Sequence, residues 1–330
     1  MPKRIVTGKG PADSKIAFVG EALGSQEERI GEPFVGPSGQ LLNELFNISG
    51  IIRSRCYITN VIKEKPDRNN IKLFIDITKK VPIITEAYKY YVSLLKEELE
   101  DIDMNVIVAV GNIPLYALTG LKMITKRRGS IYESTLLPGK KVIGIIHPSA
   151  ALRQYNYRHF ILYDLVRIRK ESEFPEVMLP KRHMITSPSF MESIEFLATC
   201  SGKPEVAFDI EVLNEEVSCI SFAYSEKDVI CIPFVGGGRD YFPPDQEVGI
   251  WKAIAVILEN NNIVKWTQNG VFDVSFLLNR FGIKTVNIQD TMIAQGVTFP
   301  EFPKGLDFLT SVFSKEPYYK DIGGKVFKNT

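Results

Sequence analysis

Two carboxylates stand two residues apart in an apolar stretch at residues 206–212 (VAFDIEV). Side chains of a strand alternate with a period of two, so Asp209 and Glu211 are predicted to share one face. Carboxylates this close repel each other, and a cation or a proton is needed to offset that cost. Asn269 and Asp273 stand four residues apart, which predicts one helical face at the start of a helix.

A second set of polar residues follows short apolar runs in the first half of the chain. Gly20 and Glu21 follow the first run, Asn60 lies in the second, and His147 and Ser149 follow the fourth. Each has an ordinary structural explanation by itself, such as a turn glycine or a capping side chain. Their common position after apolar runs is what favours a function.

The elements that position these residues can be read from the hydrophobic pattern. The runs at residues 15–20, 56–62, 106–111 and 142–146 are continuously apolar, as expected of strands buried on both faces. Helix-like segments at 38–46 and 84–99 lie between them. Alternating strands and helices predict an α/β domain with a mostly parallel sheet, whose ligand crevice lies at the carboxyl ends of the strands.

The second half has a different pattern. Residues 217–224 and 229–234 predict an antiparallel hairpin beside the strand at 206–212. A helix is expected around 246–259, then a strand at 263–266 and a helix at 271–281.

Composition bounds the class of protein. The 330 residues are 45% hydrophobic and 24% charged, which is typical of globular proteins, and the length suggests two domains. The net charge of +1 is the sum of +9 over residues 1–170 (26 Lys+Arg, 17 Asp+Glu) and −8 over the rest (14 and 22). A basic half suggests an anionic polymer as its partner.

Targeting signals are not evident in the sequence. It has no apolar run long enough for a transmembrane helix and no secretory signal. Its four cysteines form no CxxC pair. We therefore expect no membrane partner and a cytoplasmic location, in the host cell if the protein is viral.

Several motifs of the first half occur together. They are GEALG at 20–24, EE at 27–28, GEPFVGPSGQLL at 31–42, YITNV at 57–61, and HPS at 147–149 with Leu152 and Arg153. In this order they resemble family 4 uracil-DNA glycosylases over about residues 14–170. The resemblance implies a three-layer α/β/α fold and uracil-containing DNA as a partner.

The resemblance also implies roles for the pocket residues. A glycosylase flips the nucleotide out of the stack and holds it in a pocket. Phe34 would stack on uracil, Asn60 would pair with its O4/N3 edge, and His147 would donate toward O2. Glu21 would orient or activate the attacking water, or stabilise the cationic sugar.

Further residues complete this predicted set. Gly20 and Ser149 join the base-binding residues. Arg153, with Lys126, Arg127 and Arg128, would contact DNA phosphates and help to explain the basic charge.

The sequence departs from the family at two places. The family binds a 4Fe–4S cluster through four cysteines, whereas here the corresponding positions include Glu64 and fall near Tyr88. We therefore expect no iron–sulfur cluster. Leu23 also replaces the usual proline of the first motif.

Asp209, Glu211, Asn269 and Asp273, in this order, resemble the 3′–5′ exonuclease domain of family A DNA polymerases. Residues 290–294, 304–309 and 316–320 resemble the corresponding stretch of phage-type polymerases. The resemblance implies a ribonuclease H-like fold and hydrolysis of single-stranded 3′ ends. Asp209, Glu211 and Asp273 would bind Mg²⁺ or Mn²⁺, and Asn269 would contact the substrate.

The expected organisation is a glycosylase-like domain at 1–172, a linker at 173–184 and an exonuclease domain at 185–330. The family's third exonuclease motif, Tyr-x-x-x-Asp, is expected beyond Tyr318, and residues 318–321 have the wrong spacing. We therefore expect the chain to be the N-terminal part of a phage-type polymerase, with its polymerase domain following. Without the aspartate of the third motif, we expect this part alone to be a weak or inactive exonuclease.

Two alternatives stay open for the first domain. It would either excise uracil or act as a non-catalytic DNA-binding module, because excision beside a polymerase would damage the template. A small-molecule hydrolase is less favoured, since no G-x-S-x-G motif is present.

Overall fold

The computed structural model describes residues 4–178 and 181–316. The stretch at 318–321 therefore lies outside the described residues. The chain divides into two compact units, Met1–Leu179 with Asp307–Thr330, and Pro180–Leu306. Each unit is described by itself below.

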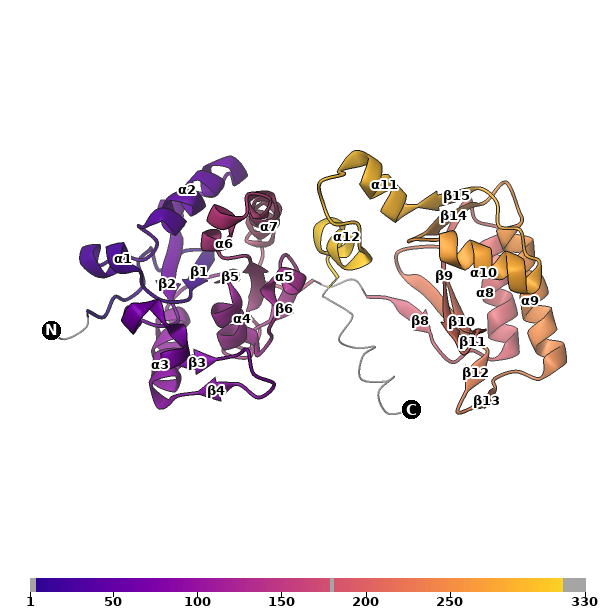
Figure 1. Cartoon of the computed structure of the whole chain (residues 1–330), viewed down its shortest axis with the longest axis horizontal. Coiled ribbons are helices and arrows are strands. Elements are labelled where there is room, and N and C mark those ends of the chain that lie inside the picture. Colours follow the sequence, from indigo (N-terminus) through magenta and orange to yellow (C-terminus); the bar gives the residue numbers. More distant parts are fainter. Residues whose placement is uncertain (1–3, 179–180, 317–330) are drawn as a thin grey trace. The chain divides into compact units, whose positions relative to one another are not determined.

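The first unit is built on a five-stranded sheet (Figure 1). Four strands are parallel and the edge strand β6 is antiparallel to β7. All residues of the four parallel strands are buried, which explains their continuously apolar runs. The predicted α/β class and mostly parallel sheet are confirmed. The strand order is β2 (Cys56–Asn60), β1 (Ile16–Gly20), β5 (Val106–Val110), β7 (Lys141–Ile145) and β6 (Ile131–Glu133).

Helices cover both faces of this sheet. α2 (Pro37–Ser49) and α7 (Tyr157–Glu171) pack together on one face, where the rings of Phe18 and Phe46 lie 4.7 Å apart. α3 (Glu86–Glu100) and α4 (Asn112–Thr119) share a hydrophobic core with Ala17 and Val19 of the alternate β1 positions. Figure 1 shows the resulting three layers, α2 and α7 above the sheet and α3 and α4 below it.

Short elements complete the first unit. They are α1 (Ser25–Ile30), β3 (Ile75–Asp76), β4 (Ile83–Ile84), α5 (Ile124–Arg127), α6 (Pro148–Arg153) and, from Asp307 on, α12 (Leu306–Phe313).

The second unit contains a six-stranded mixed sheet. β9, β10 and β11 are antiparallel neighbours, which confirms the predicted hairpin, and β14 and β15 run parallel to β9. β8 pairs in parallel with β11 and lies at the end of the stretch expected to be a linker. The order is β15 (Ile288–Asp290), β14 (Val264–Thr267), β9 (Glu205–Leu213), β10 (Glu216–Ala223), β11 (Asp228–Pro233) and β8 (His183–Ile185).

Two helices, α8 (Phe190–Ser201) and α9 (Pro244–Leu258), pack together and share a core with Phe208 and Ile210 of β9. The other elements of this unit are α10 (Val271–Phe281), α11 (Thr291–Thr298) and a small hairpin of β12 (Val235–Gly236) and β13 (Arg239–Asp240). Among the residues described, no helix is both long and apolar enough to cross a membrane.

Candidate functional site

A pocket of about 500 Å³ opens at the carboxyl ends of β1, β2 and β7. Its lining includes Glu21, Phe34, Asn60, His147 and Ser149. The parallel register of β1 and β2 sets Gly20 opposite Asn60, so both strands end at the same level. Residues that are far apart in the sequence therefore meet at one edge of the sheet, where their motifs predicted a site.

Gly20 allows two of these side chains to lie close together. A Cβ at this position would lie 2.2 Å from Oδ1 of Asn60 and 2.5 Å from the ring of Phe34. Contacts this short do not occur between real side chains, so any other residue would displace the amide or the ring. The first glycine of the motif is thus required by the pocket rather than by a turn.

The loop that carries Phe34 is held in a strained conformation. Phe34 has φ +54, a left-handed backbone that is uncommon for a bulky residue. Oε1 of Glu27 accepts hydrogen bonds from the backbone N–H groups of Val35 at 3.1 Å and Gly36 at 2.8 Å. The sequence-based prediction gave Glu27 no role, because its partner groups belong to a loop whose conformation the motif does not reveal.

His147 follows β7 and caps α6. Its Nδ1 accepts the backbone N–H of Ser149 at 3.1 Å and lies 2.7 Å from the Ser149 hydroxyl. The pKa of His147 is lowered to about 4, mainly by burial and also by the charge of Arg153, against a smaller opposing effect of Glu27. The ring is therefore neutral at pH 7, and because Nδ1 accepts, its proton is assigned to Nε2.

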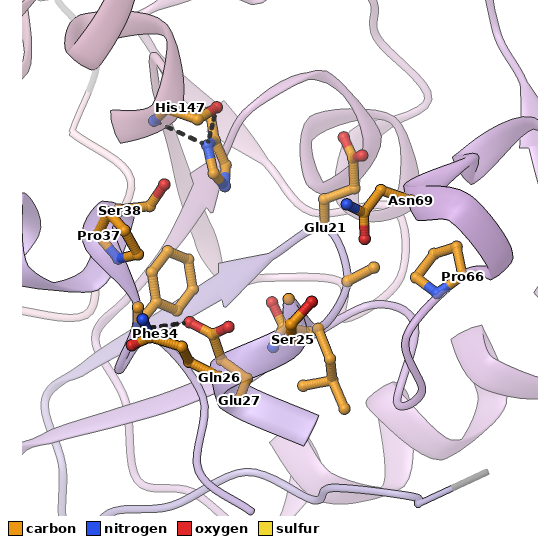
Figure 2. Close-up of a pocket in the computed structure, with 16 residues that line it drawn as sticks. Glu21, Ser25, Gln26, Glu27, Phe34, Pro37, Ser38, Pro66, Asn69 and His147 are labelled. Atoms are coloured by element: carbon orange, nitrogen blue, oxygen red, sulfur yellow. Dashed lines mark hydrogen bonds between the residues drawn. The ribbon is translucent and has the colours of Figure 1, made fainter. Parts of the chain in front are cut away.

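Two sides of the pocket differ in character, as Figure 2 shows. Phe34 and His147 lie on one side, with ring centroids 6.0 Å apart, and Glu21 and Asn69 lie on the other. Burial raises the pKa of Glu21. Asn69 was not predicted, and its φ of +56 places it in a strained loop without a recognisable sequence pattern.

The predicted phosphate-binding residues do not form one basic surface. Arg153 is exposed at the end of α6, as expected of a DNA contact. Arg127 and Arg128 are 4% and 2% exposed, so the prediction that they meet DNA phosphates is wrong. Arg128 instead forms a buried ion pair with Asp164.

The second unit places the carboxylates of Asp209 and Glu211 on the exposed face of β9, as the period of two predicted. Oδ1 of Asp273, in α10, accepts the backbone N–H of Ile210 at 2.9 Å, between the two. The pKa of Asp209 is raised to about 6, mainly by partial burial and also by the charges of Asp273 and Glu211. Burial is also the main cause of the raised pKa of Asp273.

Asn269 departs from the predicted placement. It precedes α10 with φ +62, so it does not share a helical face with Asp273. Its backbone N–H donates to Asp290 at 3.2 Å, and that of Gly270 donates at 2.8 Å. Burial alone would raise the pKa of Asp290. The N–H groups of Asn269 and Gly270, together with two further backbone donors in α11, outweigh this effect and lower the pKa.

The three carboxylates Asp209, Glu211 and Asp273 offer oxygen donors to a divalent cation. Within residues 4–178 and 181–316, no group of three or more His, Cys, Asp or Glu side chains is already arranged to hold a metal ion. The donor atoms are nonetheless carboxylate oxygens, which Mg²⁺ and Mn²⁺ prefer. Burial is the main cause of the raised pKa of Asp209, and the negative charges of Asp273 and Glu211 add to it; a cation would offset that repulsion.

Comparisons with known proteins match the two halves of the chain to two different families. Residues 7–165 match the family model of the uracil DNA glycosylase superfamily, and residues 183–323 match that of the 3′-5′ exonuclease. A type-4 uracil-DNA glycosylase of Thermotoga maritima is 38% identical over 169 residues, which are 50% of this chain and 81% of that protein.

A DNA polymerase of Bacillus phage SP01 is 24% identical over 316 residues, 87% of this chain. The match covers 33% of the polymerase, so the chain spans about a third of that relative. Among solved structures, Escherichia coli RNase D is 21% identical with a TM-score of 0.32, over 44% of this chain and 36% of that one.

Proposed function

Because residues 7–165 belong to the uracil-DNA glycosylase superfamily and a 3′–5′ exonuclease domain follows, we propose that the chain joins two activities on DNA. The first unit recognises uracil in DNA and excises it, and the second removes nucleotides from single-stranded 3′ ends. The likeness to a phage DNA polymerase supports a place for both beside DNA synthesis.

The observation that carries the first activity is the placement of a partly buried, neutral His147 beside the ring of Phe34 on the same side of one pocket. A base stacked on Phe34 would present its O4/N3 edge to the amide of Asn60, which both donates and accepts. The Nε2–H of His147 would donate to O2, where negative charge develops as the base leaves. A neutral donor suits this task, because it needs no counter-ion inside the pocket.

Glu21 is the acidic group of the proposed reaction. Its carboxylate would orient the attacking water or stabilise the positive charge that develops on the sugar. Burial strengthens this electrostatic effect, since few water molecules screen it.

The second activity rests on Asp209, Glu211 and Asp273, which would hold Mg²⁺ or Mn²⁺. When bound there, a divalent cation supplies charge stabilisation for the attacking and leaving oxygens of phosphodiester hydrolysis. The protein's own part is to hold three carboxylates near one another. The hydrogen bond from Ile210 fixes the Asp273 side chain beside β9.

One alternative for the first unit is supported by a specific observation. The relative that matches most of the chain is a DNA polymerase, and excision of uracil from its own template would leave abasic sites. A unit that binds uracil-containing DNA without excision would avoid this damage.

A uracil excision assay on the full chain decides between the two. The substrate is a 5′-labelled single-stranded oligonucleotide with one uracil and a phosphorothioate 3′ end, incubated in EDTA so that the exonuclease is silent. We expect alkali-labile abasic product, reduced at least about a hundredfold in Glu21→Gln and His147→Ala. Uracil-dependent binding without product above these variants would support the binding module.

The exonuclease is tested separately with a 5′-labelled oligonucleotide without uracil, in Mn²⁺. We expect slow 3′ shortening, because the aspartate of the third motif is missing. This shortening should be lost in Asp209→Ala and unchanged in the matched control Glu226→Gln, an exposed carboxylate in the turn after β10. Equal shortening by the Asp209 variant would contradict the proposed site.

A further inference from the structure

Arg128 is the centre of a buried contact that lies outside both proposed sites. Its Nε and Nη2 donate to the two carboxylate oxygens of Asp164 in α7, at 2.8 and 2.5 Å. The two side chains are 2% and 1% exposed. Nη1 donates to the hydroxyl of Ser311 in α12 at 3.0 Å, so a residue 183 positions away completes the set of acceptors.

Aromatic rings surround the same guanidinium. Phe160 of α7 and Phe308 of α12 have ring centroids 5.1 Å apart. Cζ of Arg128 lies 5.5 Å from the first centroid and 5.7 Å from the second. Phe308 therefore packs against an aromatic ring and a cation at once.

The C-terminal end of α12 is also bound by the first unit. Nη2 of Arg167 donates to the carbonyl of Val312 at 2.9 Å, in the helix turn whose carbonyls lack partners within the helix. Nη1 of Arg167 donates to the carbonyl of Gly129 at 2.6 Å. Beyond the helix, Lys315 pairs with the buried carboxylate of Glu171 at 3.0 Å.

We propose that this face of the first unit is a docking site for a short amphipathic helix, and that its occupant is residues 307–316 of the same chain. The exonuclease unit is then an insertion, joined to the glycosylase-like unit both before β8 and after α11. The site binds three features of the helix: the aromatic ring of Phe308, the hydroxyl of Ser311, and the backbone carbonyl of Val312 near the C-terminal end.

A glycine on the surface that binds α12 leaves room for the helix. Gly129 has φ +73, and a Cβ there would lie 3.0 Å from the carbonyl oxygen of Ser311 and 2.5 Å from Oδ1 of Asp164. A larger residue would push the helix away from Arg128. The same contacts explain why Arg128 is not available to DNA.

Amide hydrogen exchange of the full chain, followed by mass spectrometry, tests the docking. The variant Phe308→Ala removes the ring that packs against Phe160 and Arg128. Phe313→Ala, at a 68% exposed position of the same helix, is the matched control. We expect residues 307–316 of the Phe308 variant to exchange at least about tenfold faster than in the wild type. A smaller increase is expected in α7 around Asp164, with no change in β9, β10 and β11.

Ser311→Ala removes only one acceptor of Arg128 and keeps the proposal testable if the Phe308 variant does not fold. We expect the same pattern with a smaller increase, about threefold. Exchange that is unchanged in both variants would overturn the proposal. Faster exchange of the second unit with α7 unaffected would also overturn it, because the helix would then belong to the exonuclease unit.

Discussion

Oδ1 of Asp273 accepts the backbone N–H of Ile210 at 2.9 Å, and Ile210 is the residue between Asp209 and Glu211. One side-chain oxygen thus fixes the distance between α10 and β9. Burial is the main cause of the raised pKa of Asp209, and the charge of the same Asp273 carboxylate raises it further. Position 273 therefore has a structural and an electrostatic function, and substitutions can separate them.

Asp273→Asn is expected to abolish Mn²⁺-dependent exonuclease activity while preserving stability. The amide oxygen of asparagine can still accept the N–H of Ile210, but the charge is lost. Asp273→Ala leaves that buried N–H without an acceptor and should destabilise the chain by about 1–3 kcal/mol as well. Urea unfolding beside the nuclease assay compares the two variants, and equal stability losses would contradict this separation.

Glu27 is expected to control uracil recognition through the Phe34 loop. Glu27→Ala leaves the N–H groups of Val35 and Gly36 without their acceptor, and the left-handed Phe34 backbone then loses its support. We expect the preference for an oligonucleotide with uracil over one with thymine to fall about tenfold. The affinities for the two oligonucleotides are measured by fluorescence anisotropy.

Glu27→Gln is the matched control, because the amide keeps the Oε1 atom that accepts both hydrogen bonds. It should retain the preference for uracil. If the preference for uracil falls as much in the glutamine variant as in the alanine variant, the charge of Glu27 rather than its hydrogen bonds controls recognition.

The depressed pKa of His147 predicts a loss of stability in acid. The unfolded chain binds a proton at this residue near pH 6.5, and the folded chain does so only near pH 4. The contribution is therefore fully present above pH 6.5 and is lost as the pH falls toward 4. From pH 7.5 to pH 5 it amounts to about 2 kcal/mol.

Urea unfolding at pH 7.5 and pH 5 gives the free energy of unfolding of the wild type and of His147→Gln, and the difference between the two proteins measures this contribution. His147→Gln cannot titrate, so its stability should fall by about 2 kcal/mol less than that of the wild type over the same range. Parallel losses in the two proteins would show that His147 is not the group responsible.

The strands and the pocket could be predicted from the sequence because their signals are local. β1, β2, β5 and β7 are mostly apolar and wholly buried. A parallel sheet brings their carboxyl ends together, so the meeting of Asn60 and His147 follows from topology. The alternation around Asp209 similarly required only a strand.

Other features depend on contacts that no local pattern contains. Arg127 and Arg128 follow another cation, so they appeared to form a basic surface, but Arg128 has its acceptors at Asp164 and Ser311. The role of Glu27 depends on a loop with a left-handed residue. Asn269 lies outside the helix that its spacing predicted, because its backbone N–H donates to Asp290 at the end of β15.

A buried ion pair in the first unit yields a prediction on stability. The ammonium of Lys63, 1% exposed, pairs with Glu98 of α3 and donates to the hydroxyl of Thr59 at 2.7 Å. Glu98 also accepts the backbone N–H of Gly8 at 3.0 Å. Burial lowers the pKa of Lys63, while the charge and hydrogen bond of Glu98 oppose this.

Glu98→Gln removes the charge that stabilises the buried ammonium, and we expect it to destabilise the first unit by about 3–5 kcal/mol. Lys63→Met should cost less, because Glu98 is nearer the surface and keeps its hydrogen bonds from Thr59 and Gly8. Disrupting the exposed pair of Lys15 and Asp103 by Asp103→Asn should leave the free energy of unfolding nearly unchanged, because solvent screens both charges. The slowest-exchanging amides of β2 report these free energies, and a Glu98 variant as stable as the Asp103 variant would contradict the burial argument.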